Sequence, residues 1–144
     1  MKVSDAMTRD VHLATPKQSI RDVARIMAQI DSGVLPVEDN DRLVGVITDR
    51  DIAVRAVAEG KAPTTKVKDV MSQEVLYCYD DQDLDEVARN MGEVKVRRLP
   101  VVNRQKRLVG ILSFGDLARK ENPATAGKAI STISQPGGEH SQSH

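Results

Sequence analysis

Two stretches of the chain are copies of one another: residues 35–51 read LPVEDNDRLVGVITDRD, and residues 99–116 read LPVVNRQKRLVGILSFGD. Both begin with Leu-Pro-Val, pass through polar residues to Arg-Leu-Val-Gly, and end on a hydroxyl residue followed three positions later by aspartate. The second copy is one residue longer, and the additional residue falls in the polar connection, where a surface turn tolerates insertion. The chain therefore contains an internal repeat.

The repeat extends upstream of these stretches. A shift of 64 residues also aligns the segment that begins at Val3 with the one that begins at Val67, and Val23-Ala24-Arg25 with Val87-Ala88-Arg89. In each copy, apolar residues recur at the i, i+3, i+4, i+7 spacing of one buried helical face. These residues are Ile20, Val23, Ala24, Met27 and Ile30 in the first copy, and Leu84, Val87, Ala88 and Met91 in the second.

Each copy reads as a β-α-β-β-α unit. Ser19 and Asp83 precede the first helix as N-caps, with Asp22 and Glu86 three residues on. Two apolar runs joined by polar turn residues then predict a hairpin, and a second helix follows over about residues 49–59 or 115–120. We therefore predict an α+β fold with repeat 1 at residues 1–61, repeat 2 at residues 62–122, and a flexible C-terminal tail at residues 123–144.

Composition narrows the class of protein. Of the 144 residues, 40% are hydrophobic and 29% are charged. Because 21 basic residues balance 21 acidic ones, the chain has no net charge that would attract nucleic acid or an anionic membrane over distance. No apolar run approaches the roughly 20 residues of a membrane span, and the N-terminus lacks a signal-peptide pattern, so we expect a cytoplasmic protein. The single cysteine, Cys78, rules out an internal disulfide and suits a reducing compartment.

The sequence gives little support to catalysis. Outside the tail the one histidine is His12, and it has no evident partner for nucleophilic or acid–base chemistry. The glycines form neither a phosphate-binding loop nor a dinucleotide-binding pattern. His140 and His144 show no metal-ligand spacing. We therefore expect no enzyme activity, no metal and no resident cofactor.

The ends of the two copied stretches carry the candidate site. Thr48 with Asp51, and Ser113 with Asp116, stand where a buried strand passes into a helix. A hydroxyl can donate to a phosphate, and a carboxylate can accept both hydroxyls of a ribose. Each unit alone is too small to bury both faces of its sheet, so we expect the units to pack sheet to sheet with pseudo-twofold symmetry and leave grooves beside these residues.

The doubled Gly-x-x-Thr/Ser-x-x-Asp junction, the Leu-Pro-Val strand and the tandem order resemble CBS domains over about residues 3–121. The resemblance implies a pair of CBS repeats, a Bateman module, which is commonly dimeric and binds adenosine-containing ligands such as AMP or ATP. We therefore expect a homodimer that senses an adenine nucleotide in the cleft between its repeats. It is expected to regulate an unidentified protein effector in trans.

The resemblance also implies two unequal sites. Phosphate-binding members of the family often carry basic residues just before the Leu-Pro-Val strand; the second copy has Arg97-Arg98 there, and the first has Gly33-Val34. The site of Ser113 and Asp116, with both arginines and Pro100 of the strand, is expected to bind phosphorylated ligand better. The Thr48–Asp51 site is expected to borrow the arginines, hold a neutral adenosine or stay empty. Tyr77 is a candidate flank for the adenine.

Simpler interpretations of the same residues remain open. Both hydroxyl–aspartate pairs are also suitable helix caps, and the arginines also fit a solvated charged edge. A structural or stress-response protein that uses the fold only to dimerise is the principal alternative. Nucleic-acid binding through Arg97, Arg98, Arg104, Lys106 and Arg107 is a third, opposed by the zero net charge and by an aromatic content of 2%.

Overall fold

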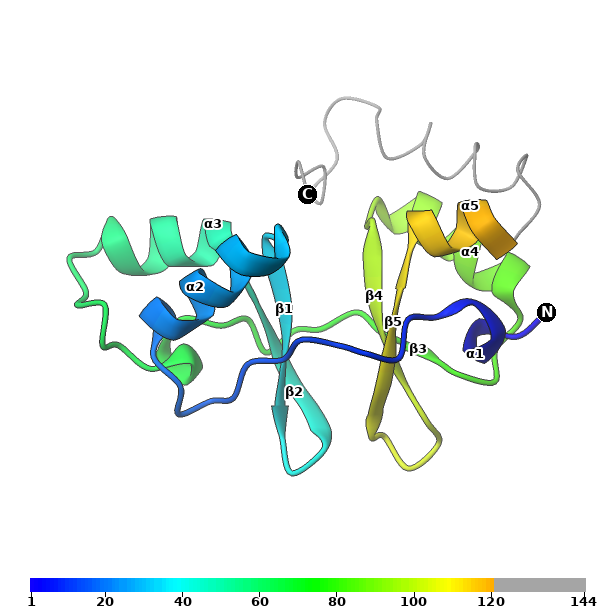
Figure 1. Ribbon diagram of the computed structural model, residues 1–144, viewed down its shortest axis with the longest axis horizontal. Helices are drawn as coiled ribbons and strands as arrows, with labels where there is room; N and C mark the ends of the chain where they lie inside the picture. The colour runs from blue at the N-terminus through cyan, green and yellow to red at the C-terminus, as the bar shows by residue number, and fades with distance from the viewer. Residues whose placement is uncertain (121–144) are drawn as a thin grey trace. The chain divides into compact units, whose positions relative to one another are not determined.

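The computed structural model describes residues 1–120, which form two compact units (Figure 1). The first-half unit comprises residues 12–75, and the second-half unit joins residues 1–11 to residues 76–120. The predicted flexible tail, residues 123–144, lies outside the described residues. In the part of the chain that is described, no helix combines the length and the apolar character needed to cross a membrane.

The first-half unit is a β-hairpin with helices on one side (Figure 1). Its elements are α2 (Ile20–Ile30), β1 (Val34–Asp39), β2 (Arg42–Thr48), α3 (Asp49–Asp51), the π-helical turn η1 (Ile52–Val57) and the 3-10 turn η2 (Val67–Asp69). Strands β1 and β2 are antiparallel, and Ala14 adds one parallel bridge to Val37. Asn40 and Asp41 both have positive φ, 52° and 66°, as a two-residue hairpin turn requires.

The second-half unit repeats this plan around a three-stranded sheet. Its elements are α1 (Val3–Ala6), β3 (Cys78–Tyr79), α4 (Leu84–Val94), β4 (Arg98–Val102), β5 (Leu108–Ser113) and α5 (Phe114–Lys120). The strand order is β3-β4-β5, with β3 parallel to β4 and β5 antiparallel to it. The additional residue of the second repeat lies in the β4–β5 connection, where Asn103 accepts hydrogen bonds from the N–H groups of Gln105 and Arg107.

Each unit has a core of its own. The amphipathic helix predicted from apolar spacing supplies part of it: Val23 and Met27 of α2 are buried in the first-half unit, and Val87 and Met91 of α4 in the second-half unit. The predicted N-caps are confirmed, because Ser19 accepts a hydrogen bond from the Asp22 N–H and Asp83 accepts one from the Glu86 N–H. The predicted α+β character and the hairpin of each repeat are confirmed as well.

The compact units differ from the sequence repeats in one respect: each incorporates a segment from the other repeat. Thr8 exchanges two backbone hydrogen bonds with Ile111 of β5, both of 2.9 Å, and Ser72 does the same with Val46 of β2. Val3 is fully buried in the second-half unit and Val67 in the first-half unit. Residues 1–11, which open the first repeat in sequence, therefore complete the fold of the second.

The lone cysteine is a buried core residue, as its position in a strand suggests. Burial, with a smaller contribution from the charge of Asp80, raises the pKa of the Cys78 thiol to about 12. Because the thiolate is the reactive form, we expect iodoacetamide at pH 8 to alkylate native Cys78 about a thousandfold more slowly than the denatured chain. Mass spectrometry of the labelled protein with and without urea measures this ratio. Equal rates would show that Cys78 is accessible in the folded state.

Candidate functional site

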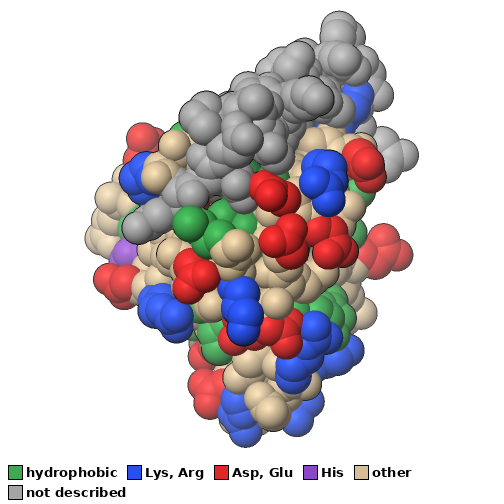
Figure 2. Space-filling view, turned by 90° about the vertical axis from the view of Figure 1, so that its right-hand side faces the viewer, with side chains coloured by type: hydrophobic (Ala, Val, Ile, Leu, Met, Phe, Trp, Pro, Cys, Tyr) green, Lys and Arg blue, Asp and Glu red, His purple; other side chains and the backbone are tan. Residues whose placement is uncertain are grey.

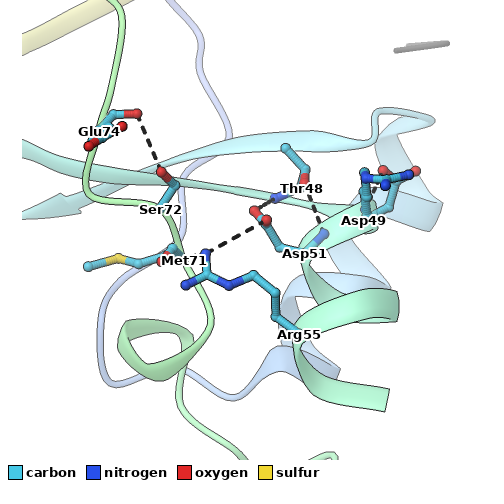
Figure 3. A network of polar contacts seen from close by, with 8 residues as sticks. Thr48, Asp49, Asp51, Arg55, Met71, Ser72 and Glu74 are labelled. Carbon is cyan, nitrogen blue, oxygen red and sulfur yellow. Dashed lines mark hydrogen bonds and ion pairs between the residues drawn. The ribbon is translucent and has the colours of Figure 1, made fainter. Parts of the chain in front are cut away.

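The junction between β2 and α3 in the first-half unit is a reciprocal helix cap (Figure 3). The N–H of Thr48 donates to Oδ2 of Asp51 at 2.9 Å, and the N–H of Asp51 donates to Oγ1 of Thr48 at 3.0 Å. Thr48 and Asp51 therefore form the helix cap that their spacing allows. It leaves the Thr48 hydroxyl proton without an acceptor among the described residues.

Arg55 lies one helical turn beyond Asp51 and faces the same junction (Figure 3). Its Nη1 is 4.0 Å from Oδ1 of Asp51 and donates to the carbonyl oxygen of Met71 at 3.3 Å. The Asp51 side chain remains 19% exposed, and the Arg55 side chain 51%. Asp51 therefore presents a partly accessible carboxylate with a cation beside it.

The equivalent junction between β5 and α5 has the same cap and further contacts. Oδ2 of Asp116 accepts from the N–H of Ser113 at 3.0 Å and from its hydroxyl at 3.1 Å, and the Asp116 N–H donates to Oγ of Ser113 at 3.3 Å. Oδ1 of Asp116 accepts from the hydroxyl of Thr8 at 3.2 Å and from the guanidinium of Arg119. The Asp116 side chain is 2% exposed.

The structure brings the arginine pair to the Ser113 end of the sheet. Arg98 lies opposite Ser113 in the β4–β5 register, and the carbonyl of Arg97 accepts from the N–H of Phe114 at 3.3 Å. Both arginine side chains are exposed and have interactions within the protein. Pro100 is buried opposite Ile111. Arg98 and Ser113 side chains share one face of the sheet, because directly opposed residues do so.

Tyr77 belongs to a different cluster, at the hairpin end of the same sheet. Its ring meets Tyr79 edge to face at 5.7 Å, and its hydroxyl is 3.4 Å from Nζ of Lys106. Hydrogen bonding to Tyr79, and then to Lys106, lowers the pKa of Tyr77. Tyr79 pairs with Val102, four residues from Arg98 and so about 13 Å along the strand. The contacts of Tyr77 are therefore with the turn and not with the Ser113–Asp116 pair.

The basic residues of the turn are partly neutralised. Arg104 forms two hydrogen bonds to Asp81, at 2.8 and 2.7 Å, and stacks on Tyr79 at 4.1 Å. Figure 2, which looks onto the right-hand side of Figure 1, shows acidic and basic side chains interspersed. Among the described residues visible on this face, the basic side chains form no continuous surface for a phosphate backbone. Within residues 1–120, no group of three or more His, Cys, Asp or Glu side chains is arranged to hold a metal ion.

Three residues around the junctions were not singled out from the sequence. Arg55 and Arg119 follow their aspartates by four and three residues, so helical spacing was a usable signal for both. Thr8 contacts Asp116 across 108 positions of sequence. No local sequence pattern predicts this contact, because the contact depends on the exchange of segments between the repeats.

Comparison with known proteins agrees with the fold and with the repeated junction. Residues 3–57 and 67–122 each match the CBS domain family. The CBS domain-containing protein YhcV of Bacillus subtilis is 39% identical over 133 residues, which cover 92% of this chain and 94% of that protein. A sequence built of two α+β repeats, each closed by a hydroxyl–aspartate junction, thus defines a tandem CBS protein. The chain belongs to the CBS domain family.

Two similar solved structures contain adenosine compounds. The crystal structure of CBSX2 in complex with AMP is 32% identical, with a TM-score of 0.71, and the match covers 82% of this chain and 93% of that one. The CBS domain pair of MJ0100 was solved in complex with 5′-methylthioadenosine and S-adenosyl-L-methionine. It is 30% identical, with a TM-score of 0.69 and coverage of 83% and 94%.

Proposed function

We propose that the chain is a non-catalytic regulatory module that binds an adenosine-containing nucleotide, forms a homodimer and acts in trans on a protein effector. The observation that carries the proposal is the Asp51 carboxylate in α3, just after β2, partly exposed beside the hydroxyl of Thr48. The adenosine compounds bound to CBSX2 and to the MJ0100 domain pair support the ligand class.

The chemistry of the Thr48–Asp51 junction suits a ribose. Of the roughly four acceptor positions on a carboxylate, Asp51 uses one for the Thr48 N–H, and Arg55 approaches another at 4.0 Å. Two vicinal hydroxyls can donate to the remaining positions, and hydrogen bonds to a charged group contribute about 1.5–3 kcal/mol each. The half-exposed guanidinium of Arg55 supplies a positive charge next to them.

A ligand-independent structural protein is the second candidate, and the capping geometry favours it. Both aspartates already accept the N–H of the residue that begins their junction. A chain that needs them only for this purpose would keep the same hydroxyl–aspartate spacing. Such a protein would form a dimer whose stability does not respond to nucleotides.

Thermal denaturation with AMP, ADP, ATP, NAD and S-adenosylmethionine distinguishes the two candidates. At about 100 times the dissociation constant, a ligand adds about 2.7 kcal/mol to the free energy of unfolding, which for a chain of this length raises the Tm by roughly 10 °C. We expect such a rise with at least one compound, and none with guanosine or cytidine nucleotides. Identical melting curves with every compound would favour the structural candidate.

A further inference from the structure

The two hydroxyl–aspartate junctions differ in how many of the protein's own donors they receive. Four donors surround the Asp116 carboxylate: the N–H and hydroxyl of Ser113, the hydroxyl of Thr8 and the guanidinium of Arg119. This number saturates the acceptor positions of a carboxylate. At Asp51, the Thr48 N–H donates at 2.9 Å and Arg55 stands at 4.0 Å.

One of these donors, the Thr8 hydroxyl, comes from an exchanged segment. Thr8 and Ser72 are equivalent in the repeat, and each makes the same pair of 2.9 Å backbone hydrogen bonds to its strand. Their hydroxyls then diverge: Thr8 donates to Asp116 at 3.2 Å, whereas Ser72 donates to the carbonyl of Glu74 at 3.4 Å (Figure 3). The first-half unit therefore lacks the contact that closes the Asp116 carboxylate in the second-half unit.

The hydroxyl groups of the two junctions also differ in whether their protons are donated within the protein. The Ser113 hydroxyl donates to Asp116, so both of its polar functions are used, since it also accepts the Asp116 N–H. In the described part of the chain, the Thr48 hydroxyl accepts the Asp51 N–H and has no acceptor of its own. A ligand oxygen near Thr48 could accept a hydrogen bond from the Thr48 hydroxyl, whereas a ligand oxygen near Ser113 would compete with Asp116 for the proton of the Ser113 hydroxyl.

From these contacts we infer that the chain binds one nucleotide, at the Thr48–Asp51 junction, and that Asp116 is a structural clasp. Asp116 joins three parts of the second-half unit: the end of β5, helix α5 and the segment of residues 1–11 that carries Thr8. This inference rests on the proposed nucleotide binding and adds its location and stoichiometry. It reverses the order expected from the arginine pair, because a ribose at Asp116 would first have to displace Thr8 and Arg119.

Isothermal titration of the full chain with AMP tests this assignment. Asp51→Asn preserves an acceptor for the Thr48 N–H but removes the charge, and is expected to weaken AMP binding 10- to 100-fold with little change in Tm. Thr8→Val and Asp116→Asn are the matched variants of the other junction. Both are expected to keep the AMP dissociation constant within about threefold and to lower the Tm, Asp116→Asn the more strongly because it affects three neighbours.

A second ligand locates the ribose. 2′-Deoxy-AMP lacks one of the two hydroxyls, so it is expected to bind more weakly than AMP to the unmodified protein. The difference in affinity between the two nucleotides should shrink in Asp51→Asn and persist in Thr8→Val. Thr8→Val removes only one contact of the clasp, so it serves as the control if Asp116→Asn does not fold.

The outcomes separate this inference from the proposed function. One AMP per chain, with discrimination against 2′-deoxy-AMP lost only in Asp51→Asn, supports the single-site assignment. Two AMP per chain, or discrimination lost in Thr8→Val and kept in Asp51→Asn, would overturn the assignment and leave nucleotide binding intact. Absence of binding by AMP and by every other adenosine compound would overturn both.

Discussion

Replacing Gly110 with alanine is expected to lower the free energy of unfolding by about 1–3 kcal/mol, the usual cost of overpacking. A Cβ at this position would lie 2.7 Å from Sδ of Met7 and 2.9 Å from the carbonyl oxygen of Thr8. That carbonyl accepts the N–H of Ile111 at 2.9 Å, so it cannot retreat without weakening the bond that holds residues 1–11 to β5. A loss near 3 kcal/mol would be a large share of the 5–15 kcal/mol typical of a domain.

Gly115→Ala is the control for this substitution. Its Cβ would have ordinary contacts, at 3.5 Å to Arg119 and 3.6 Å to Ser113 in the first turn of α5, so we expect no loss and up to about 1 kcal/mol of gain. Gly45→Ala should reproduce the Gly110→Ala effect in the other unit, since its Cβ would lie 2.8 Å from both Met71 Sδ and the Ser72 carbonyl. Urea denaturation of the three variants measures these differences. Equal stability of Gly110→Ala and Gly115→Ala would show that the exchanged segment shifts freely.

Local features of this chain were predictable from sequence because they depend on residues close together along it. The N-cap at Ser19 requires only the N–H of Asp22, and helix α2 requires an apolar stripe that recurs within eleven residues. The hairpin turn at Asn40 and Asp41 likewise follows from two residues that tolerate positive φ. The repeat strengthened the predictions of the N-cap and of the helix, since the same pattern occurs in both copies.

The exchange of segments was not predictable in this way. Residues 1–11 and their repeat equivalents, residues 65–75, have similar sequences, so either could complete either unit on apolar pattern alone. The choice depends on long-range packing, such as Val3 with the core of the second-half unit. The same limitation applies to the candidate site. The spacing of Ser113 and Asp116 matches that of Thr48 and Asp51, but the spacing does not reveal that Thr8, 108 positions away, donates to one of the two carboxylates.

The substitution Val3→Asp tests the segment exchange directly. Val3 is fully buried in the core that contains Leu84 of α4 and Leu117 of α5, and its N–H donates to the carbonyl of Gln82 at 3.0 Å. An aspartate there would be a buried charge without a partner, which destabilises by about 3–5 kcal/mol. Because residues 1–11 belong to the second-half unit, the loss is expected there, although Val3 opens the first repeat in sequence.

Val67→Asp is the matched substitution in the first-half unit, since Val67 is the repeat equivalent of Val3 and is also fully buried. Hydrogen exchange followed by mass spectrometry distinguishes the two variants by location. Val3→Asp should accelerate exchange in residues 84–94 more than in residues 20–30, and Val67→Asp should do the opposite. If Val3→Asp instead exposes residues 20–30 first, then residues 1–11 fold with their own repeat in solution. The clasp at Asp116 would then lose its contact with Thr8, and the reason for ranking Asp51 as the nucleotide site would disappear with it.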